Sequence, residues 1–133
     1  MNAATAPLDR IHSFIAAYTA RHVEDVVACY APSQAIAAIG TDREQNYVGP
    51  DAMRQGLATD FLSFDRAEID IVWHHAGTEG DTGWVVAACR ALFALGQEEV
   101  HVALRLSAVL KCYDGNWLPV SYTHLTLPTK RIV

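Results

Sequence analysis

Asp60 is the best candidate in this sequence for a group that moves protons. Thr59 and Phe61 flank it, and partial desolvation beside an aromatic ring raises the pKa of a carboxyl group toward the range useful for a general base. The alternative is an ordinary solvated position on a helix. Tyr18 is the tyrosine we expect to assist Asp60, in isomerisation, cyclisation, dehydration or hydration.

Two arginines are candidates for binding an anionic group of a ligand. Arg54 precedes Asp60 by six residues, so the two do not share one helix face closely. Arg90 lies in the apolar run 84–95, where an unpaired charge is costly. Either Arg90 binds an anion in a pocket, or it forms an ion pair on the outer face of a sheet or at a subunit interface.

Aromatic side chains offer further ligand contacts. Trp73 and Trp84 could stack on a flat ligand, although large aromatics on sheets also serve as plain core. Tyr30 and Tyr47 are other polar groups for a pocket, with core or rim positions as the alternative.

No metal or cofactor is expected. His74 and His75 are adjacent, so on a strand they point to opposite faces, and the sequence has no HExxH, HxH, P-loop or GxGxxG pattern. Cys29, Cys89 and Cys112 show no metal-ligand spacing, and an odd number of cysteines indicates buried thiols in a reducing, cytoplasmic compartment.

Composition excludes several classes of protein. The 133 residues suit one domain, and 51% hydrophobic against 19% charged residues excludes a disordered chain. A net charge of −5 with scattered basic residues argues against nucleic-acid binding. No apolar run is long enough to span a membrane, and the first residues do not read as a secretory signal.

The hydrophobic periodicity predicts an α+β fold, with helices first and long strands afterwards. The third helix begins at Pro50 and buries Met53, Leu57, Phe61 and Phe64, and Ile69, Ile71 and Trp73 share the buried face of a strand. The other expected elements are helices over 8–18 and 23–30, strands over 35–39, 84–95 and 100–113, and a hairpin turn at 114–116.

This order, with the segments YAP and AIAAIGTDREQNYVGPDAMRQGLATDF and a closing DGNW, resembles the SnoaL-like group of the nuclear transport factor 2-like superfamily, which has the cystatin-like fold. The resemblance implies a cone-shaped barrel in which three N-terminal helices pack on a curved, mainly antiparallel sheet around a pocket. It also implies a homodimer through the outer sheet face, in line with a sheet too apolar to be solvated on one side. Members include steroid isomerases, cyclases, dehydratases and non-enzymatic carriers.

The resemblance also allows a test residue by residue. The tyrosine, the carboxylate base and the second acid of steroid isomerases fall on Phe14, Ala38 and Ala108, none of which can move a proton. Steroid isomerase chemistry is therefore not expected. By the same resemblance, Phe14 and Leu106 face the interior of the cone.

Residues 120–129, VSYTHLTLPT, resemble the translation of a transposase adapter used to prepare sequencing libraries. We therefore predict a SnoaL-like domain over 1–118, with its native final strand truncated, and an adapter-derived tail over 119–133. A natural strand is the alternative, because Val, Tyr and Thr favour strands. No chemistry is assigned to Ser121, Tyr122 or His124.

Two functions remain open. The first is binding of a small apolar or aromatic molecule in the cone, with or without turnover; its expected ligand-binding residues are Phe14, Arg54, Trp84, Arg90 and Leu106. The second is a non-catalytic dimerisation or partner-binding module with a packed cone. A cavity of several hundred cubic ångströms with convergent polar groups favours the first, and a filled cone favours the second.

Overall fold

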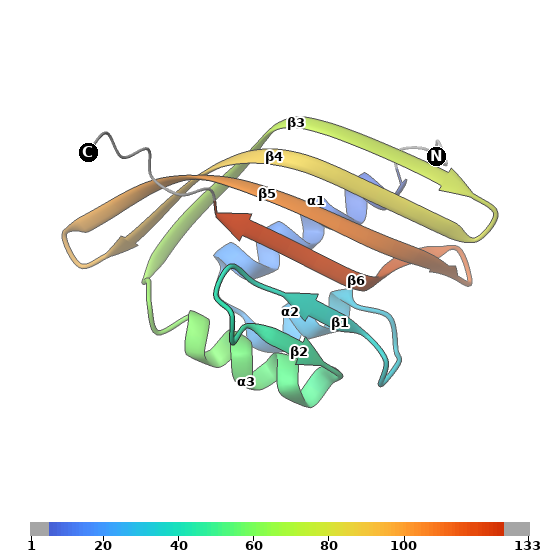
Figure 1. The fold of residues 1–133 in the computed structure, drawn as a ribbon, viewed down its shortest axis with the longest axis horizontal. Helices are drawn as coiled ribbons and strands as arrows, with labels where there is room; N and C mark the ends of the chain where they lie inside the picture. The colour runs from blue at the N-terminus through green and yellow to red at the C-terminus, as the bar shows by residue number, and fades with distance from the viewer. Residues whose placement is uncertain (1–5, 127–133) are drawn as a thin grey trace.

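The computed structural model describes residues 6–126, which form three helices followed by long strands (Figure 1). No helix in this range is long and apolar enough to cross a membrane. The elements are α1 (Ala6–Thr19), α2 (Val23–Cys29), β1 (Ala37–Ile39), β2 (Asn46–Val48), α3 (Pro50–Asp60), β3 (Arg66–Glu79), β4 (Thr82–Leu95), β5 (Glu98–Tyr113) and β6 (Asn116–Thr126).

The six strands form one curved sheet in the order β2-β1-β6-β5-β4-β3 (Figure 1). Every neighbouring pair is antiparallel except β1 and β6, which are parallel. The β5–β6 hairpin turns at Asp114 and Gly115, whose φ angles of 51° and 83° are both positive, as a two-residue type I′ turn requires. The α+β class and the helix-first order predicted from the sequence are confirmed.

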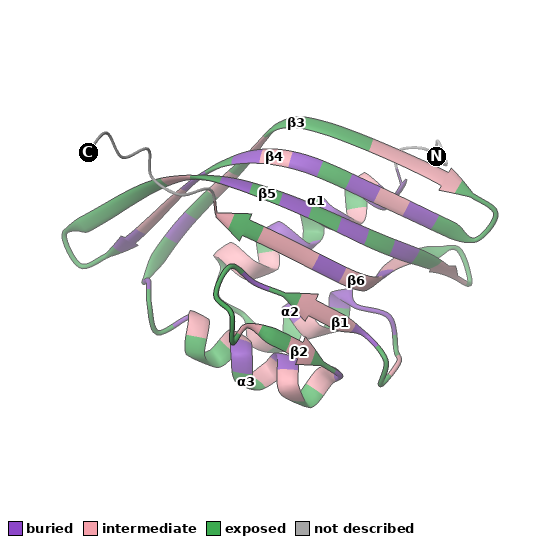
Figure 2. Cartoon of the chain, in the orientation of Figure 1, coloured by how far each residue is buried: buried purple, intermediate pink, exposed green. Residues whose placement is uncertain are grey.

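The helices cover one face of the sheet, and the core lies between the two layers (Figure 2). On β5 every second residue is buried, because successive side chains of a strand point to opposite faces. The buried members are Leu104, Leu106, Ala108 and Leu110, so Leu106 lies on the inner face, as the resemblance implied. From α1, Ile11, Phe14 and Ile15 pack against them.

Strand β3 departs from the expected alternation. Ile69 and Ile71 are partly buried, but Trp73 is 59% exposed. A bulge at Val72 inserts one residue into the register with β4, so Trp73 lies on the outer face of the sheet instead of the inner one. The sequence expectation for Trp73 was therefore wrong.

Two further differences concern the segment before β3. The short strand β2 was not expected, and it pairs with β1 as a small hairpin at the edge of the sheet. Helix α3 ends at Asp60, so Phe61 and Phe64 are buried from the loop that follows it.

Residues 119–126 form most of β6, between β5 and β1. Tyr122 is only 7% exposed in the core. The domain boundary at residue 118 and the adapter origin of 119–133 concern the gene and stay predictions; residues 127–133 lie outside the described range.

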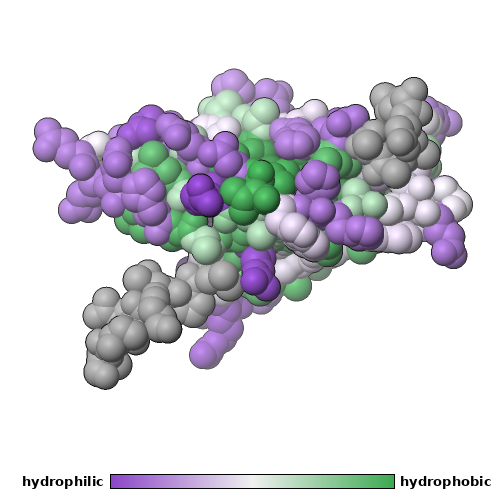
Figure 3. Space-filling view, turned by 90° about the horizontal axis from the view of Figure 1, so that it is seen from above, coloured by the Kyte–Doolittle hydropathy of each residue, from purple (hydrophilic) through white to green (hydrophobic). Residues whose placement is uncertain are grey.

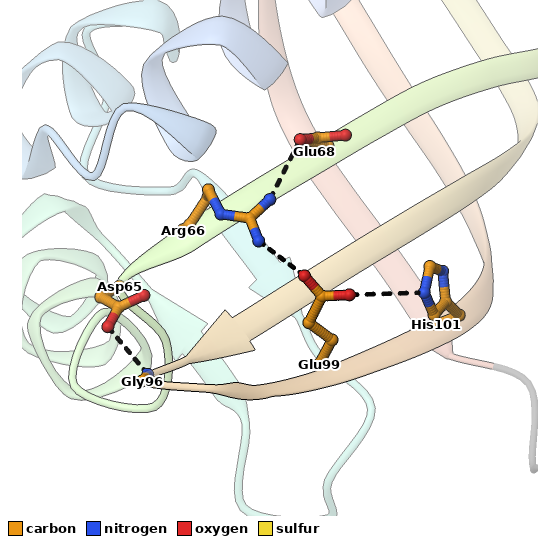
Figure 4. Close-up of polar contacts among 6 residues, drawn as sticks. All are labelled: Asp65, Arg66, Glu68, Gly96, Glu99 and His101. Carbon is orange, nitrogen blue, oxygen red and sulfur yellow. Dashed lines mark hydrogen bonds and ion pairs between the residues drawn. The ribbon is translucent and has the colours of Figure 1, made fainter.

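Polar contacts tie the start of β3 to the β4–β5 turn (Figure 4). The Asp65 carboxylate accepts a hydrogen bond from the Gly96 backbone N–H at 3.0 Å. Arg66 forms ion pairs with Glu99 at 2.8 Å and Glu68 at 3.2 Å. Because these side chains are exposed, each pair contributes little, about 0–1 kcal/mol.

The face assignment of β5 predicts different effects for two neighbouring residues. Leu110→Ala, at a fully buried position, should lower the free energy of unfolding by about 2–5 kcal/mol. Val109→Ala, at a position 43% exposed on the other face, should lower it by less than about 1 kcal/mol. Urea denaturation of both variants measures this, and equal losses would contradict the assignment.

Candidate functional site

Asp60 is brought to the interior by the apolar face of α3. Met53, Gly56, Leu57 and Asp60 are spaced three, one and three residues apart, which places them on one side of a helix. All four line one cavity. The helix begins at Pro50, directly after Gly49, whose φ of 87° suits a glycine, and it ends with Asp60 as its last residue.

This cavity, which we call the cone pocket, has a volume of about 40 Å³. A volume of about 10–15 Å³ holds one water molecule, so the space suits a very small molecule, well below the roughly 300–1,000 Å³ of drug-sized sites. Most of its wall is apolar or aromatic. The lining residues are Phe14, Tyr18, Val26, Tyr30, Ala38, Ile39, Gly40, Gln45, Tyr47, Met53, Gly56, Leu57, Asp60, Tyr122 and His124.

Two neutral groups hold the Asp60 carboxylate. The Tyr18 hydroxyl donates to Oδ2 at 3.3 Å, and the Gln45 Nε2 donates to Oδ1 at 3.2 Å. Burial raises the pKa of Asp60 above its ordinary value; the hydrogen bond from Tyr18 lowers this pKa, and the nearby Asp42 raises it. Tyr18, whose pKa is raised by burial and then by Asp60, stays protonated.

The loop between β1 and β2 positions Gln45. Its backbone carbonyl accepts a hydrogen bond from the Gly40 N–H at 2.8 Å, and its side-chain Oε1 accepts one from the Asp42 N–H at 3.0 Å. A Cβ on Gly40 would collide with the Gln45 side chain. The glycine therefore leaves the space in which the amide reaches Asp60, and sequence reasoning missed Gln45 because this contact depends on the loop conformation.

Tyr47 lies at the same end of the pocket. A Cβ on Gly56 would overlap its ring, so the small residue in α3 makes room for it. The pKa of Tyr47 is raised by burial and by the charges of Asp60 and Asp42. Tyr30, also considered as a polar group, lines the pocket but is buried with its ring edge against Phe14.

A second cavity of about 40 Å³ shares Phe14, Tyr18, Tyr122 and His124 with the cone pocket. Aromatic contacts fill much of the cone around it: Tyr18 packs on Phe61 at 5.2 Å between ring centroids, and Phe14 on Tyr122 at 4.5 Å. The interior thus has the convergent polar groups expected of a ligand pocket, but its free volume is far below the several hundred cubic ångströms expected, and in this respect it resembles a packed cone.

Tyr122 and His124, to which sequence reasoning assigned no chemistry, lie in the walls of both cavities. Burial lowers the pKa of His124, so this imidazole is neutral near pH 7. Both residues belong to the segment predicted to derive from an adapter. The hydrogen bonds to the Asp60 carboxylate come from Tyr18 and Gln45, which lie outside that segment.

Two of the other expected ligand-binding residues, Phe14 and Leu106, lie in the interior of the fold. Phe14 lines both cavities, and Leu106 is buried in the sheet without lining either. Ala38, at the place of the isomerase base, also lines the cone pocket, while Ala108 is buried in β5.

Arg54, Trp84 and Arg90 do not line the cone pocket. Arg54 points away from it and binds Glu24 at 2.9 Å and Asp51 at 2.8 Å. The alternation of β4 places Trp84 and Arg90 on the outer face, because the buried, inward-facing residues of this stretch are the odd-numbered Val85, Ala87 and Cys89.

Arg90 is exposed opposite Asp70, and within residues 6–126 it has no ion-pair partner within 4.0 Å. The expected anion clamp is therefore not assembled around the pocket. Nor do the described residues contain a group of three or more His, Cys, Asp or Glu that could hold a metal ion.

The raised pKa of Asp60 makes the stability of the fold depend on pH. The pKa of Asp60 is higher in the folded protein than in the unfolded chain, where it is near 3.8. The protonated carboxyl therefore stabilises the fold below pH 3.8, and this stabilisation is lost as the pH rises through the folded pKa. Asp60→Asn, which cannot ionise, should therefore gain stability relative to wild type across this window, as measured by denaturation from pH 3.5 upward. A constant difference between the two proteins would contradict the raised pKa, and Asp70→Asn on the exposed sheet face is the control.

Comparison with known proteins agrees with this architecture. The family profile of the SnoaL-like domain matches residues 8–128. No curated protein matches the sequence. A provisionally assigned dehydratase of the NTF2-like family from Streptomyces avermitilis superposes with a TM-score of 0.82 at 12% identity, covering 95% of this chain and 96% of the other.

Two further structures are similar to this chain. A ketosteroid isomerase-like protein from Erwinia carotovora atroseptica has a TM-score of 0.78 at 17% identity, covering 97% of this chain and all of its own (100%). A provisionally assigned association domain of a calcium/calmodulin-dependent protein kinase II type from Xanthomonas campestris has a TM-score of 0.77 at 16% identity, covering 89% and 83%. At these identities the likeness establishes the fold alone. Because the family profile covers most of the sequence, the chain belongs to the SnoaL-like domain family.

Proposed function

We propose that the cone pocket binds a small, largely apolar molecule whose one polar group meets Asp60 and Tyr18. The observation that carries the proposal is the Asp60 carboxylate, partly buried in an apolar pocket and held by two neutral hydrogen-bond donors. Burying a charge is costly, and protein interiors retain such groups mostly where they do chemistry or bind.

Asp60 acts as the proton acceptor in this proposal. A raised pKa makes the Asp60 carboxylate a stronger base than an exposed aspartate. A general base is most effective when its pKa lies near the working pH, and burial moves Asp60 in that direction. For a carbonyl ligand, the C–H proton passes to the Asp60 carboxylate. The hydroxyl hydrogen of the protonated Tyr18, which points at Asp60 in the free protein, turns to the oxygen of the resulting enolate and stabilises it. Isomerisation, cyclisation and dehydration all include such a step.

The similar structures support this type of chemistry by name only, since two are described as a dehydratase and as ketosteroid isomerase-like. Here the polar groups come from α1 and α3 and from the β1–β2 loop, and the isomerase positions carry Phe14, Ala38 and Ala108. The proposed base, Asp60, is the last residue of α3.

Hydrogen–deuterium exchange tests the proton acceptor without knowledge of the natural substrate. Acetone fits the small pocket, and wild-type protein in D₂O should speed exchange of its α-protons, followed by NMR. Asp60→Asn should lose most of this rate, since general-base catalysis contributes about 10²–10⁴-fold. Asp70→Asn, the same change on the outer face, should keep it. Equal rates for all three proteins would remove Asp60 as a base.

A second candidate function is association of two copies through the outer face of the sheet, with a packed cone. Its support is the set of apolar side chains exposed on this face. Figure 3 looks down on the β3 edge of the sheet and shows hydrophobic atoms bordered by hydrophilic ones there. The exposed or partly exposed members on β3, β4 and β5 are Trp73, Trp84, Val86, Ala88, Leu92 and Val109. Contiguous apolar surface of this kind marks interaction sites.

The association candidate predicts a dimer that one charge disrupts. Wild-type protein should sediment as a dimer at micromolar concentration, and Val86→Glu, in the middle of the face, should sediment as a monomer. Leu62→Glu, at a position 79% exposed after α3, is the matched control and should stay dimeric. A monomeric wild type, or a dimeric Val86→Glu variant, would contradict the candidate.

A further inference from the structure

The described lining of the cone pocket contains an acidic side chain but no cationic one. Among residues 6–126, the lining includes one carboxylate, that of Asp60, and no lysine or arginine. Its two hydrogen-bond donors, Tyr18 and Gln45, are neutral. His124, the remaining basic side chain of the wall, is kept neutral near pH 7 by burial.

A second carboxylate adds to the negative potential. Asp42, in the loop that carries Gln45, raises the pKa of both Asp60 and Tyr47 through its charge. Asp42 is exposed and does not line the pocket, but its charge adds to that of Asp60 at this end, so an anionic ligand placed there would be repelled.

Two arginines near α3 are engaged elsewhere, and Arg43 of the β1–β2 loop is exposed and does not line the pocket. Arg21 donates to the backbone carbonyl of Phe61 at 2.8 Å, and Arg54 pairs with Glu24 and Asp51. Neither lines the pocket. A partly buried carboxylate without a cationic partner in the described chain is an unusual arrangement, because buried charges are normally paired.

The remaining walls suit a cation as well. Phe14, Tyr18, Tyr30 and Tyr47 are among the lining residues, and aromatic rings attract ammonium groups through the negative potential of their faces. A carboxylate combined with aromatic walls and no cationic side chain among the described lining residues is the chemistry that recognises an organic ammonium ion.

We infer that the ligand of the cone pocket is a small apolar amine, whose protonated nitrogen pairs with the Asp60 carboxylate. The inference rests on the binding part of the proposed function, a small apolar molecule whose polar group meets Asp60, and not on the proton-acceptor step. It names the charge of that polar group and makes Asp60 its counter-ion. The cavity of about 40 Å³ restricts the amine to a short chain unless aromatic side chains rotate.

Binding of n-propylamine, 1-propanol and acetate, three probes of similar size, tests the inference. Protein-detected NMR titration of the full chain at neutral pH should show n-propylamine binding about ten-fold more tightly than 1-propanol, as a charge-assisted hydrogen bond provides, and acetate not binding. The shifts should include the side-chain amide of Gln45. Asp60→Asn should reduce the affinity for n-propylamine to that for 1-propanol, and Asp70→Asn should leave it unchanged.

The outcomes separate this inference from the function on which it rests. If n-propylamine binds no more tightly than 1-propanol, or if Asp60→Asn leaves its affinity unchanged, the inference is wrong. Asp60-dependent exchange of acetone would in that case still support the proposed function. If no probe binds and acetone exchange is not catalysed, both are wrong.

Discussion

The packing of this domain has to accommodate one carboxylate in an apolar interior. Asp60 continues the apolar face of α3, so the spacing that buries Met53 and Leu57 also carries the acid inward. The cost of removing it from water is offset by hydrogen bonds from two elements that are distant in sequence, Tyr18 of α1 and Gln45 of the β1–β2 loop. The small hairpin at the edge of the sheet is thus coupled to the helix layer through this group.

The interior around Asp60 is filled mostly by rings. Aromatic contacts among Tyr18, Phe61 and Phe64 leave cavities of only about 40 Å³, so shape limits ligands as strongly as charge does. The architecture of this chain therefore allows two uses, one based on the polar end of the cone and the other on the apolar outer face of the sheet. The position of Asp60 favours the first, because a plain structural core gains nothing from a partly buried acid.

Hydrophobic periodicity was enough to predict the α+β class and the helix order, since these depend on local patterns, whereas the inward position of Leu106 was implied by the family resemblance. Asp60 and Tyr18 were also predicted, from residue type and neighbours, and the structure places them 3.3 Å apart. The bulge at Val72, which turns Trp73 outward, has no local signal in the sequence. The contact of Gln45 with Asp60 depends on the conformation of the 40–45 loop, which the sequence does not predict. The sequence also does not show that Arg54 pairs with Glu24, or which face of β4 carries Arg90, so both arginines were expected near the pocket.

The central claim is that Asp60 is a partly desolvated carboxylate inside the cone. Carbon-13 NMR of the Asp60 side chain, followed through a pH titration of the wild-type protein, measures its pKa directly. We expect the pKa of Asp60 to lie clearly above the ordinary aspartate value of 3.8, and to rise further in the Tyr18→Phe variant, which lacks the hydroxyl that stabilises the charged form. A pKa at or below the ordinary value, unchanged in Tyr18→Phe, would show a solvated surface acid and contradict the account.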